Sequence, residues 1–276
     1  MTEFEVLPVT ANMNSVGDLI REWRARRRMS QFDLASEADI SQRHLSFLES
    51  GRAAPSRDMV IRLADGLDVP LRHRNRLLLA AGFAPHYSER PLTDPSLSPA
   101  LETVKLVLKG HEPFPAFAVD SHWNMVTANN AVGPLIADIK EPALLDPPVN
   151  VMRLCLHPGG LASRIVNLTE WRAHLLARLK QQNETFGDPR LEELERELRS
   201  YPGGISKSRI VHDNGTAIAH MLRLRAGADV LSFISTITVF GTALDVTLSE
   251  LAIESFFPAD PETSAILSHL AKKRSG

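Results

Sequence analysis

The chain has 276 residues, of which 43% are hydrophobic, and this length suits one large or two ordinary globular domains. A formal net charge of −2 does not indicate a polyanionic partner for the chain as a whole, and the single cysteine, Cys155, excludes an intrachain disulfide and a cysteine-based zinc site. No apolar run is long enough to span a bilayer and no signal peptide opens the sequence, so we expect a soluble, cytoplasmic protein without a membrane partner.

Positive charge is concentrated near the N-terminus. Residues 21–28 contain five arginines, whereas the first lysine is Lys105. The planar guanidinium group suits phosphate, so the run indicates a local basic surface. Two interpretations stay open for it: a solvated helix face, or phosphate contacts by Arg26–Arg28 at the end of the first helix.

Residues 1–14 predict a flexible tail, and the pattern that follows, up to Gly82, is helical. Apolar residues recur at helical spacing, and residues typical of helix starts lie between the successive apolar stretches. Ser30 and Asp33 fit a capping box, for example. Five helices are predicted. The first begins near Val16, where apolar residues start to recur at helical spacing, and the other four begin at Ser30, Ser41, Pro55-Ser56 and Pro70.

The third of these helices opens with polar residues, which is unusual for a helix that must pack. Two short helices joined by a tight turn, with a polar start to the second, fit a helix-turn-helix whose second helix enters the DNA major groove. Glutamine and arginine can each form two hydrogen bonds to a base edge. The candidate contact residues on this helix are Ser41, Gln42, Arg43, His44, Ser46 and Phe47.

Within this set, Ser41 is expected to cap the helix, and Gln42 and Arg43 to meet bases. His44 is expected to reach a phosphate or a base. Phe47 has two open interpretations: contact with a thymine methyl group, or packing beneath the fourth helix.

Residues 15–82 resemble the Cro/C1-type helix-turn-helix domain of the Xre family. The matching residues are Gln31, Leu34-Ala35, Ile40-Ser41, Leu45, Leu48-Glu49, Gly51 and Pro55-Ser56. The resemblance implies an all-α, five-helix, lambda-repressor-like domain that binds DNA sequence-specifically, with phosphate contacts by Gln31, Arg52 and Arg57. Asp39 stands where the family usually has a turn glycine, and aspartate tolerates the left-handed conformation better than most residues.

Residues 83–99 carry four prolines and three serines and are the predicted linker. Beyond it the sequence alternates between strand and helix patterns, which predicts an α+β domain with one antiparallel sheet. Strands are expected at 116–120, 122–129, 207–212, 217–225, 229–240 and 250–256, and helices at 101–108, 130–138, 168–181, 189–200 and from 261.

Residues 100–276 resemble the ligand-binding domain of MmyB-like transcription regulators. The resemblance is carried by the blocks PAFAVDSHWNMVTANNA, NVMRLCLHPGGLASRIVNLTEWRAHLLARL, LRSYPG and FISTITVFGTALDVTLSELAIESFFPAD, in that order. It implies a PAS-like domain: a small antiparallel sheet with helices on one side, enclosing an apolar pocket. The ligand class that it suggests is a fatty acid.

Candidate pocket residues are of two kinds. The apolar ones, which could instead be plain core, are Trp123, Met125, Phe233, Ile237 and Phe240. The polar ones are Arg153, which could hold a ligand carboxylate or pair with an acidic side chain, and His157, which could also cap a helix or brace a loop.

No catalytic or metal-binding constellation is present: there is no glycine-rich phosphate loop, no H-E-x-x-H and no nucleophile elbow. We therefore expect a non-enzymatic transcription regulator without a metal or cofactor, apart from a possible bound fatty acid or similar apolar molecule. We expect it to act as a homodimer on an inverted-repeat operator in double-stranded DNA. The alternatives are a C-terminal domain that only dimerises or binds a protein, and an enzyme fused to a DNA-targeting module.

Overall fold

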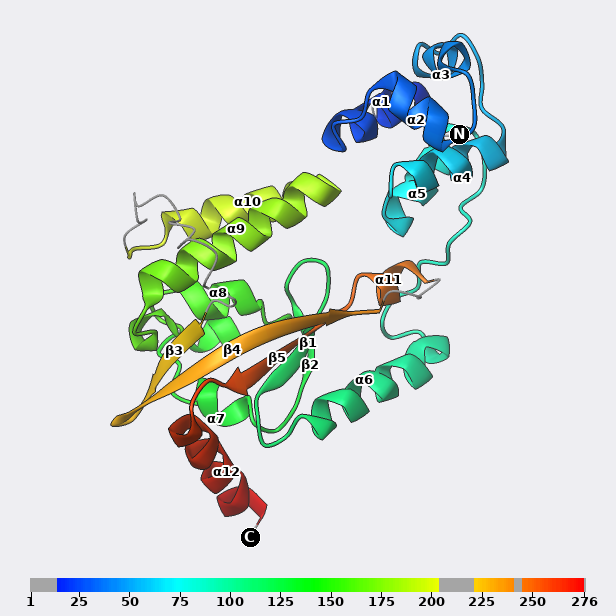
Figure 1. Cartoon of the computed structure of the whole chain (residues 1–276). Coiled ribbons are helices and arrows are strands. Elements are labelled where there is room, and N and C mark those ends of the chain that lie inside the picture. Colours follow the sequence, from blue (N-terminus) through cyan, green and yellow to red (C-terminus); the bar gives the residue numbers. More distant parts are fainter. Residues whose placement is uncertain (1–13, 204–220, 241–244, 276) are drawn as a thin grey trace, which may run out of the picture. The chain divides into compact units, whose positions relative to one another are not determined.

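The computed structural model describes residues 14–203, 221–240 and 245–275 (Figure 1). The chain divides into two compact units between Glu89 and Arg90, inside the range predicted as a linker. The expected tail 1–14, except for its last residue, and the expected strand 207–212 lie outside the described residues. No helix among the described residues is long and apolar enough to cross a membrane.

The described part of the N-terminal unit contains five helices, as predicted. Four begin at serine caps whose hydroxyl oxygens accept a backbone N–H three residues on, so the caps satisfy donors that a helix start leaves unpaired. The capping box of Ser30 and Asp33 is present. The helices are α1 (Val16–Arg26), α2 (Gln31–Glu37), α3 (Gln42–Glu49), α4 (Arg57–Gly66) and α5 (Leu71–Ala80).

Two backbone features position α3. Asp39, in the turn between α2 and α3, has a φ of 52°, the left-handed conformation for which glycine is usually chosen. Gly17 lets α1 pass close to the end of α3, because a Cβ there would lie 2.5 Å from the carbonyl oxygen of Leu48. The turn sets the direction in which α3 begins, and the close approach sets how its last turn packs against α1.

The segment after α5 packs back onto that helix. The Asn75 side chain accepts hydrogen bonds from the backbone N–H groups of His86 and Tyr87, at 2.9 and 3.0 Å, and donates to the Tyr87 carbonyl at 2.7 Å. The first part of the predicted linker is therefore held by the N-terminal unit.

The C-terminal unit is built on an antiparallel sheet whose described strands lie in the order β2-β1-β5-β4-β3. The α+β fold with an antiparallel sheet is confirmed. The strands are β1 (Ala116–Val119), β2 (Met125–Ala128), β3 (Met221–Ala226), β4 (Asp229–Val239) and β5 (Ala252–Pro258).

Helices lie on both faces of this sheet, whereas the family resemblance implied one. The helices of this unit are α6 (Ser98–Gly110), α7 (Gly133–Ile136), α8 (Val151–Leu156), α9 (Leu168–Phe186), α10 (Pro189–Ser200), α11 (Val246–Ser249) and α12 (Pro261–Ser275). Val104 and Leu108 of α6 pack on Ala116, Ala118 and Ile253, separately from the main core. The helix expected at 130–138 is limited to α7, which has Pro134 in its first turn.

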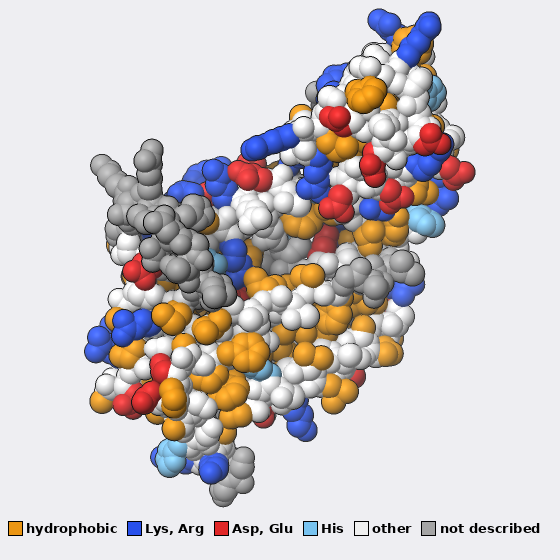
Figure 2. Space-filling view, in the orientation of Figure 1, with side chains coloured by type: hydrophobic (Ala, Val, Ile, Leu, Met, Phe, Trp, Pro, Cys, Tyr) orange, Lys and Arg blue, Asp and Glu red, His pale blue; other side chains and the backbone are white. Residues whose placement is uncertain are grey.

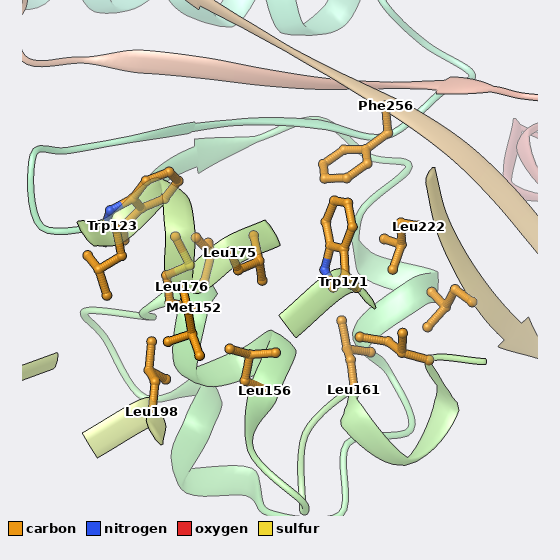
Figure 3. Close-up of a cluster of buried hydrophobic side chains, with 14 of the residues drawn as sticks. Trp123, Met152, Leu156, Leu161, Trp171, Leu175, Leu176, Leu198, Leu222 and Phe256 are labelled. Atoms are coloured by element: carbon orange, nitrogen blue, oxygen red, sulfur yellow. The ribbon is translucent and has the colours of Figure 1, made fainter. Parts of the chain in front are cut away.

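The main core lies between the opposite face of the sheet and helices α8, α9 and α10 (Figure 3). Its largest buried members include Trp171 of α9 and Phe233 of β4. Leu191, Leu194 and Leu198 of α10 are also buried here, so this stripe packs inside its own unit. Asn129 holds the corner after β2, where its side-chain amide donates to the carbonyls of Leu108 and Phe114.

Candidate nucleic-acid interface and ligand cavity

Helix α3 keeps a polar, exposed face at its N-terminal end. The Ser41 hydroxyl accepts the backbone N–H of His44 at 3.1 Å and caps the helix. Gln42, Arg43 and His44 are exposed, while Leu45 and Leu48 are buried and anchor the helix. The first turn of α3 thus presents side chains that can donate hydrogen bonds, with no role in the core.

Phe47 has an environment that neither sequence interpretation described. Its ring is half-buried, and the guanidinium groups of Arg43 and Arg52 lie over it, 5.4 and 5.8 Å from the ring centroid. The negative face of the ring attracts both cations. Phe47 therefore holds two arginines at the surface. Figure 2 shows basic side chains next to a hydrophobic side chain at the end of the unit where Figure 1 labels α3.

A buried carboxylate ties α3 to the rest of the unit. Glu49, 3% exposed, accepts hydrogen bonds from Arg24 at 2.7 and 3.1 Å and from the Gln31 amide at 2.8 Å. Burial raises the pKa of Glu49, but the bonds from Arg24 and Gln31 and the charges of Arg24 and Arg21 outweigh it, so the pKa is lowered. The carboxylate is charged in the folded unit at neutral pH.

The arginine run 21–28 is partly structural, a role that the sequence analysis did not consider. Arg21 donates to the Glu49 carbonyl, and Arg27 donates to the Leu67 carbonyl at 2.8 Å. Arg26 pairs with Glu22 and lies over the Trp23 ring. These arginines connect α1 to neighbouring helices or pack along it.

The remaining predicted DNA contacts lie around α3. Gln31 is the first residue of α2, half-buried, with its amide on Glu49. Ser46 is half-buried on α3. Arg52 and Arg57 are exposed, and Arg57 Nη2 lies 2.8 Å from Nδ1 of His86.

An apolar cavity of about 70 Å³ lies within the C-terminal unit, between the sheet and helices α7 and α8. Of the predicted pocket residues, Met125 and Phe233 line it. The complete lining is Pro115, Phe117, Met125, Val132, Leu135, Ile136, Val151, Leu154, Cys155, Leu161, Leu222, Leu224, Phe233 and Phe256.

Trp123 is a candidate that the structure places in the core, outside the cavity lining. Its indole N–H donates to the Gln182 side chain at 2.6 Å, and the Arg178 guanidinium lies 4.4 Å from its ring centroid. Arg178 in turn pairs with the buried carboxylate of Glu254 at 3.2 Å.

The two polar candidates also lie outside the lining. Arg153 makes a two-pronged ion pair with Glu197, at 2.7–3.0 Å, which was the alternative to a ligand carboxylate. The hydrogen bond from Arg153 lowers the pKa of Glu197. His157 follows α8 and braces the next loop, since its Nδ1 accepts the Gly159 N–H at 3.0 Å.

The candidates at the end of β4 and just beyond it, Ile237 and Phe240, do not line the cavity either. Ile237 is 45% exposed, and Phe240 packs on the α6 cluster on the other face of the sheet. Phe240 follows the strand and packs with Val104 and Leu108 of α6, whereas Phe233 packs in the main core on the other face. Of the three candidates Phe233, Ile237 and Phe240, Phe233 lines the cavity.

Several lining residues were missed by sequence reasoning. Leu222 and Leu224 alternate with the exposed Met221 and Arg223, a pattern that could have identified them. Cys155 lines the cavity as well, and burial raises the pKa of its thiol to about 12. Among the described residues, no group of side chains is arranged to hold a metal ion.

Comparison with known proteins places both units. Residues 100–270 match the family model described as the MmyB-like transcription regulator ligand binding domain, and residues 20–73 match the helix-turn-helix model. A crystal structure of the clp gene regulator ClgR from C. glutamicum is similar at 25% identity, with a TM-score of 0.22, over 24% of this chain and 83% of that chain. No curated protein matches this chain.

Proposed function

The chain belongs to the MmyB-like transcription regulators, and on that premise we propose that its apolar cavity binds a small apolar molecule that tunes the affinity of the helix-turn-helix unit for DNA. The observation that carries the ligand part is the cavity itself, whose lining is entirely apolar. Pockets for small molecules are concave and mostly apolar, and this one lies in the unit that matches a ligand-binding family.

The protein is a DNA-binding transcription regulator. We infer that α3 lies in the major groove with Gln42 and Arg43 at base edges, since both side chains are exposed on its first turn. Arg43 and Arg52 share the ring of Phe47, so one cation can meet a base while its neighbour meets the backbone. Arg57 and the N-terminal end of α2, at Gln31, are the further phosphate contacts in this proposal.

We propose a homodimer on an inverted repeat. A single helix-turn-helix contacts only a few base pairs, so two copies related by a two-fold axis are needed to select one operator. The half-sites would then lie one turn of DNA apart, or a multiple of it.

The ligand in this proposal is a fatty acid or a molecule of similar apolar character. Its chain would contact Leu154, Leu224 and Phe256, while the cavity of about 70 Å³ holds only a small guest unless lining side chains move. Arg153 would not receive a carboxylate, because Glu197 already occupies it. Met125, Leu135 and Ile136 of the lining are half-buried, so their side chains have room to move outward and enlarge the cavity.

Ligand binding alters DNA affinity only if the protein has two conformations that differ in affinity for DNA and the ligand binds one of them more tightly. A typical coupling between two sites is about 1–3 kcal/mol, which is a change of roughly 5–150-fold in affinity. The segment 83–99 joins the units, and its residues 86 and 87 are already bound to Asn75 of α5.

The test combines ligand identification with DNA titration. Purified protein is extracted with organic solvent for mass spectrometry, and stripped and reloaded protein are titrated against operator DNA. The cavity-filling variant Leu135→Phe should lose both ligand and coupling, and Leu101→Phe, on α6 outside the lining, is the matched control. Identical titrations with and without ligand would leave a C-terminal unit that only dimerises or binds a protein.

A further inference from the structure

The cavity lining contains no charged side chain and no side-chain nitrogen or oxygen. A ligand that is oriented in such a site must find its polar partner just behind the lining, because specificity in apolar pockets comes from a few placed polar groups. Two groups lie there: the indole of Trp171 and the ion pair of Arg178 with Glu254.

Trp171 carries a buried donor that is not satisfied. The residue is 2% exposed, and its Nε1 has no hydrogen-bond partner among the described residues. The thiol of Cys155, which lines the cavity, lies close enough to interact with this N–H, but sulfur is a weak acceptor. Buried polar groups in native proteins are nearly always paired, so an unpaired one next to a cavity is a reason to look for a ligand.

The surroundings of Trp171 point in the same direction. Trp171 belongs to the same buried cluster as Phe256, Leu161 and Leu222, which Figure 3 draws around it. All three of these neighbours line the cavity. Cys155 lines the cavity and interacts with Trp171, so its side chain lies between the cavity and the indole N–H.

Trp123 shows that the unpaired donor is specific to one position. It belongs to the same core cluster, but its N–H already donates to Gln182 at 2.6 Å. The core thus contains one satisfied indole away from the cavity and one unsatisfied indole beside it.

The ion pair of Arg178 with Glu254 disfavours a ligand that carries a carboxylate. Glu254 is 4% exposed and lies opposite Phe117 in the β1–β5 register, on the cavity side of the sheet. Among the described residues it forms an ion pair with Arg178. Burial raises the pKa of Glu254 against the opposing effect of Arg178. If a ligand carboxylate took Arg178, Glu254 would have to stay as an unpaired buried charge or take up a proton, and either costs free energy.

We propose that the cavity takes a neutral molecule with an apolar body and one hydrogen-bond acceptor, such as a ketone or ester oxygen, which receives the N–H of Trp171. This rests on the proposed function of the cavity as a ligand site, and it narrows the ligand from a fatty acid or similar apolar molecule to the neutral members of that class, such as an ester or ketone. The donor selects for an acceptor, and the buried Glu254 selects against a free acid.

The test uses the full chain, stripped of bound lipid, and three probes of similar size. They are hexan-2-one, its isostere 2-methylhex-1-ene, in which a CH₂ group replaces the carbonyl oxygen, and hexanoate. Binding is followed through the indole N–H signals of ¹⁵N-tryptophan-labelled protein, which contains three tryptophans. The ketone oxygen gives up hydrogen bonds to water on binding, so the bond to Trp171 is measured by how far the ketone-to-alkene affinity ratio falls when the donor is removed; we expect about tenfold, which is about 1.4 kcal/mol. Hexanoate should bind weakest.

Only the Trp171 indole signal should move downfield with the ketone. Trp171→Phe should lower the ketone-to-alkene affinity ratio about tenfold, and the matched Trp123→Phe should leave it unchanged, because that indole already has its partner. If Trp171→Phe does not fold, the signal shift in the unmodified protein decides.

The outcomes separate this inference from the proposed function. Binding of none of the probes, in unmodified and variant protein alike, would overturn the cavity as a ligand site. The same ketone-to-alkene affinity ratio in unmodified protein and Trp171→Phe, with an unmoved Trp171 signal, would overturn only the donor assignment. Tighter binding of hexanoate would overturn the selection for neutral ligands and assign the acid to Arg178.

Discussion

The guanidinium of Arg24, on α1, makes a two-bond ion pair with the carboxylate of Glu49, the last residue of α3, with distances of 2.7 Å (Nε–Oε1) and 3.1 Å (Nη2–Oε2). The Gln31 amide of α2 donates to the same carboxylate. Three helices therefore meet at one buried charge, which fixes the helix that we propose reads DNA.

Glu49→Gln should lower the free energy of unfolding by about 2–3 kcal/mol at pH 7, because Arg24 loses its buried counter-charge. The pKa of Glu49 is lowered in the folded state, so its carboxylate stabilises the fold above its unfolded value of 4.5, and this stability is lost as the pH falls through the folded pKa. Denaturant unfolding at pH 7 and below pH 4 should show the difference shrinking with acid.

The control for this variant is Glu22→Gln, which removes an exposed ion pair with Arg26. Exposed pairs contribute little, so the expected change is under about 0.5 kcal/mol. An equal loss for both variants, or a loss at Glu49 that does not depend on pH, would contradict the role given to the buried carboxylate.

Arg43→Ala and Gln42→Ala should each cost about 1–3 kcal/mol on the cognate operator and relax base preference at one position. Both side chains are exposed on the first turn of α3, where a base edge can be reached. Binding selection from randomised DNA measures the preference. An unchanged preference for Arg43→Ala would mean that α3 does not read the sequence as proposed.

Arg52→Ala should weaken binding to all DNA sequences about equally and reduce the slope of log affinity against log salt by about one. The residue follows α3, and its guanidinium lies over Phe47 rather than on the first turn. Salt titrations on operator and unrelated DNA check this. A loss confined to the operator would instead make Arg52 a base-reading residue.

Cys155 should resist alkylation in the folded protein. Burial raises the pKa of its thiol to about 12, and the partial exposure of the side chain is to the cavity that it lines. At pH 8 the reactive thiolate is then scarcer than in the unfolded chain by about 10³-fold. Iodoacetamide labelling followed by mass spectrometry should give rates in about that ratio, and similar rates in native and denatured protein would contradict the buried placement.

The proposed dimer predicts a two-fold symmetric footprint with two protected half-sites. Analytical ultracentrifugation of protein with operator should give two chains per site, since each chain contributes one α3. One short asymmetric site bound by a single chain would exclude the inverted-repeat proposal.

The sequence alone determined the features that depend on near neighbours. Ser30, Ser41 and Ser56 cap their helices because a serine oxygen needs only the N–H three residues on, and Asp39 takes the left-handed turn for an equally local reason. Apolar periodicity located helices α9 and α10 and strand β4 closely. These signals, with the family resemblance, were enough to predict both folds.

Only the tertiary structure decided which side chains line the cavity and which are taken by partners elsewhere. Arg153 is separated from Glu197 by 44 residues and Arg24 from Glu49 by 25, so no local pattern predicts either pair. The alternation along a strand allowed two faces for Phe233 and Phe240, and the packing of α6 and α8 assigned one face to each. The unpaired N–H of Trp171 is likewise visible only once distant segments are packed around it, because an unsatisfied donor is a property of its surroundings and not of the residue.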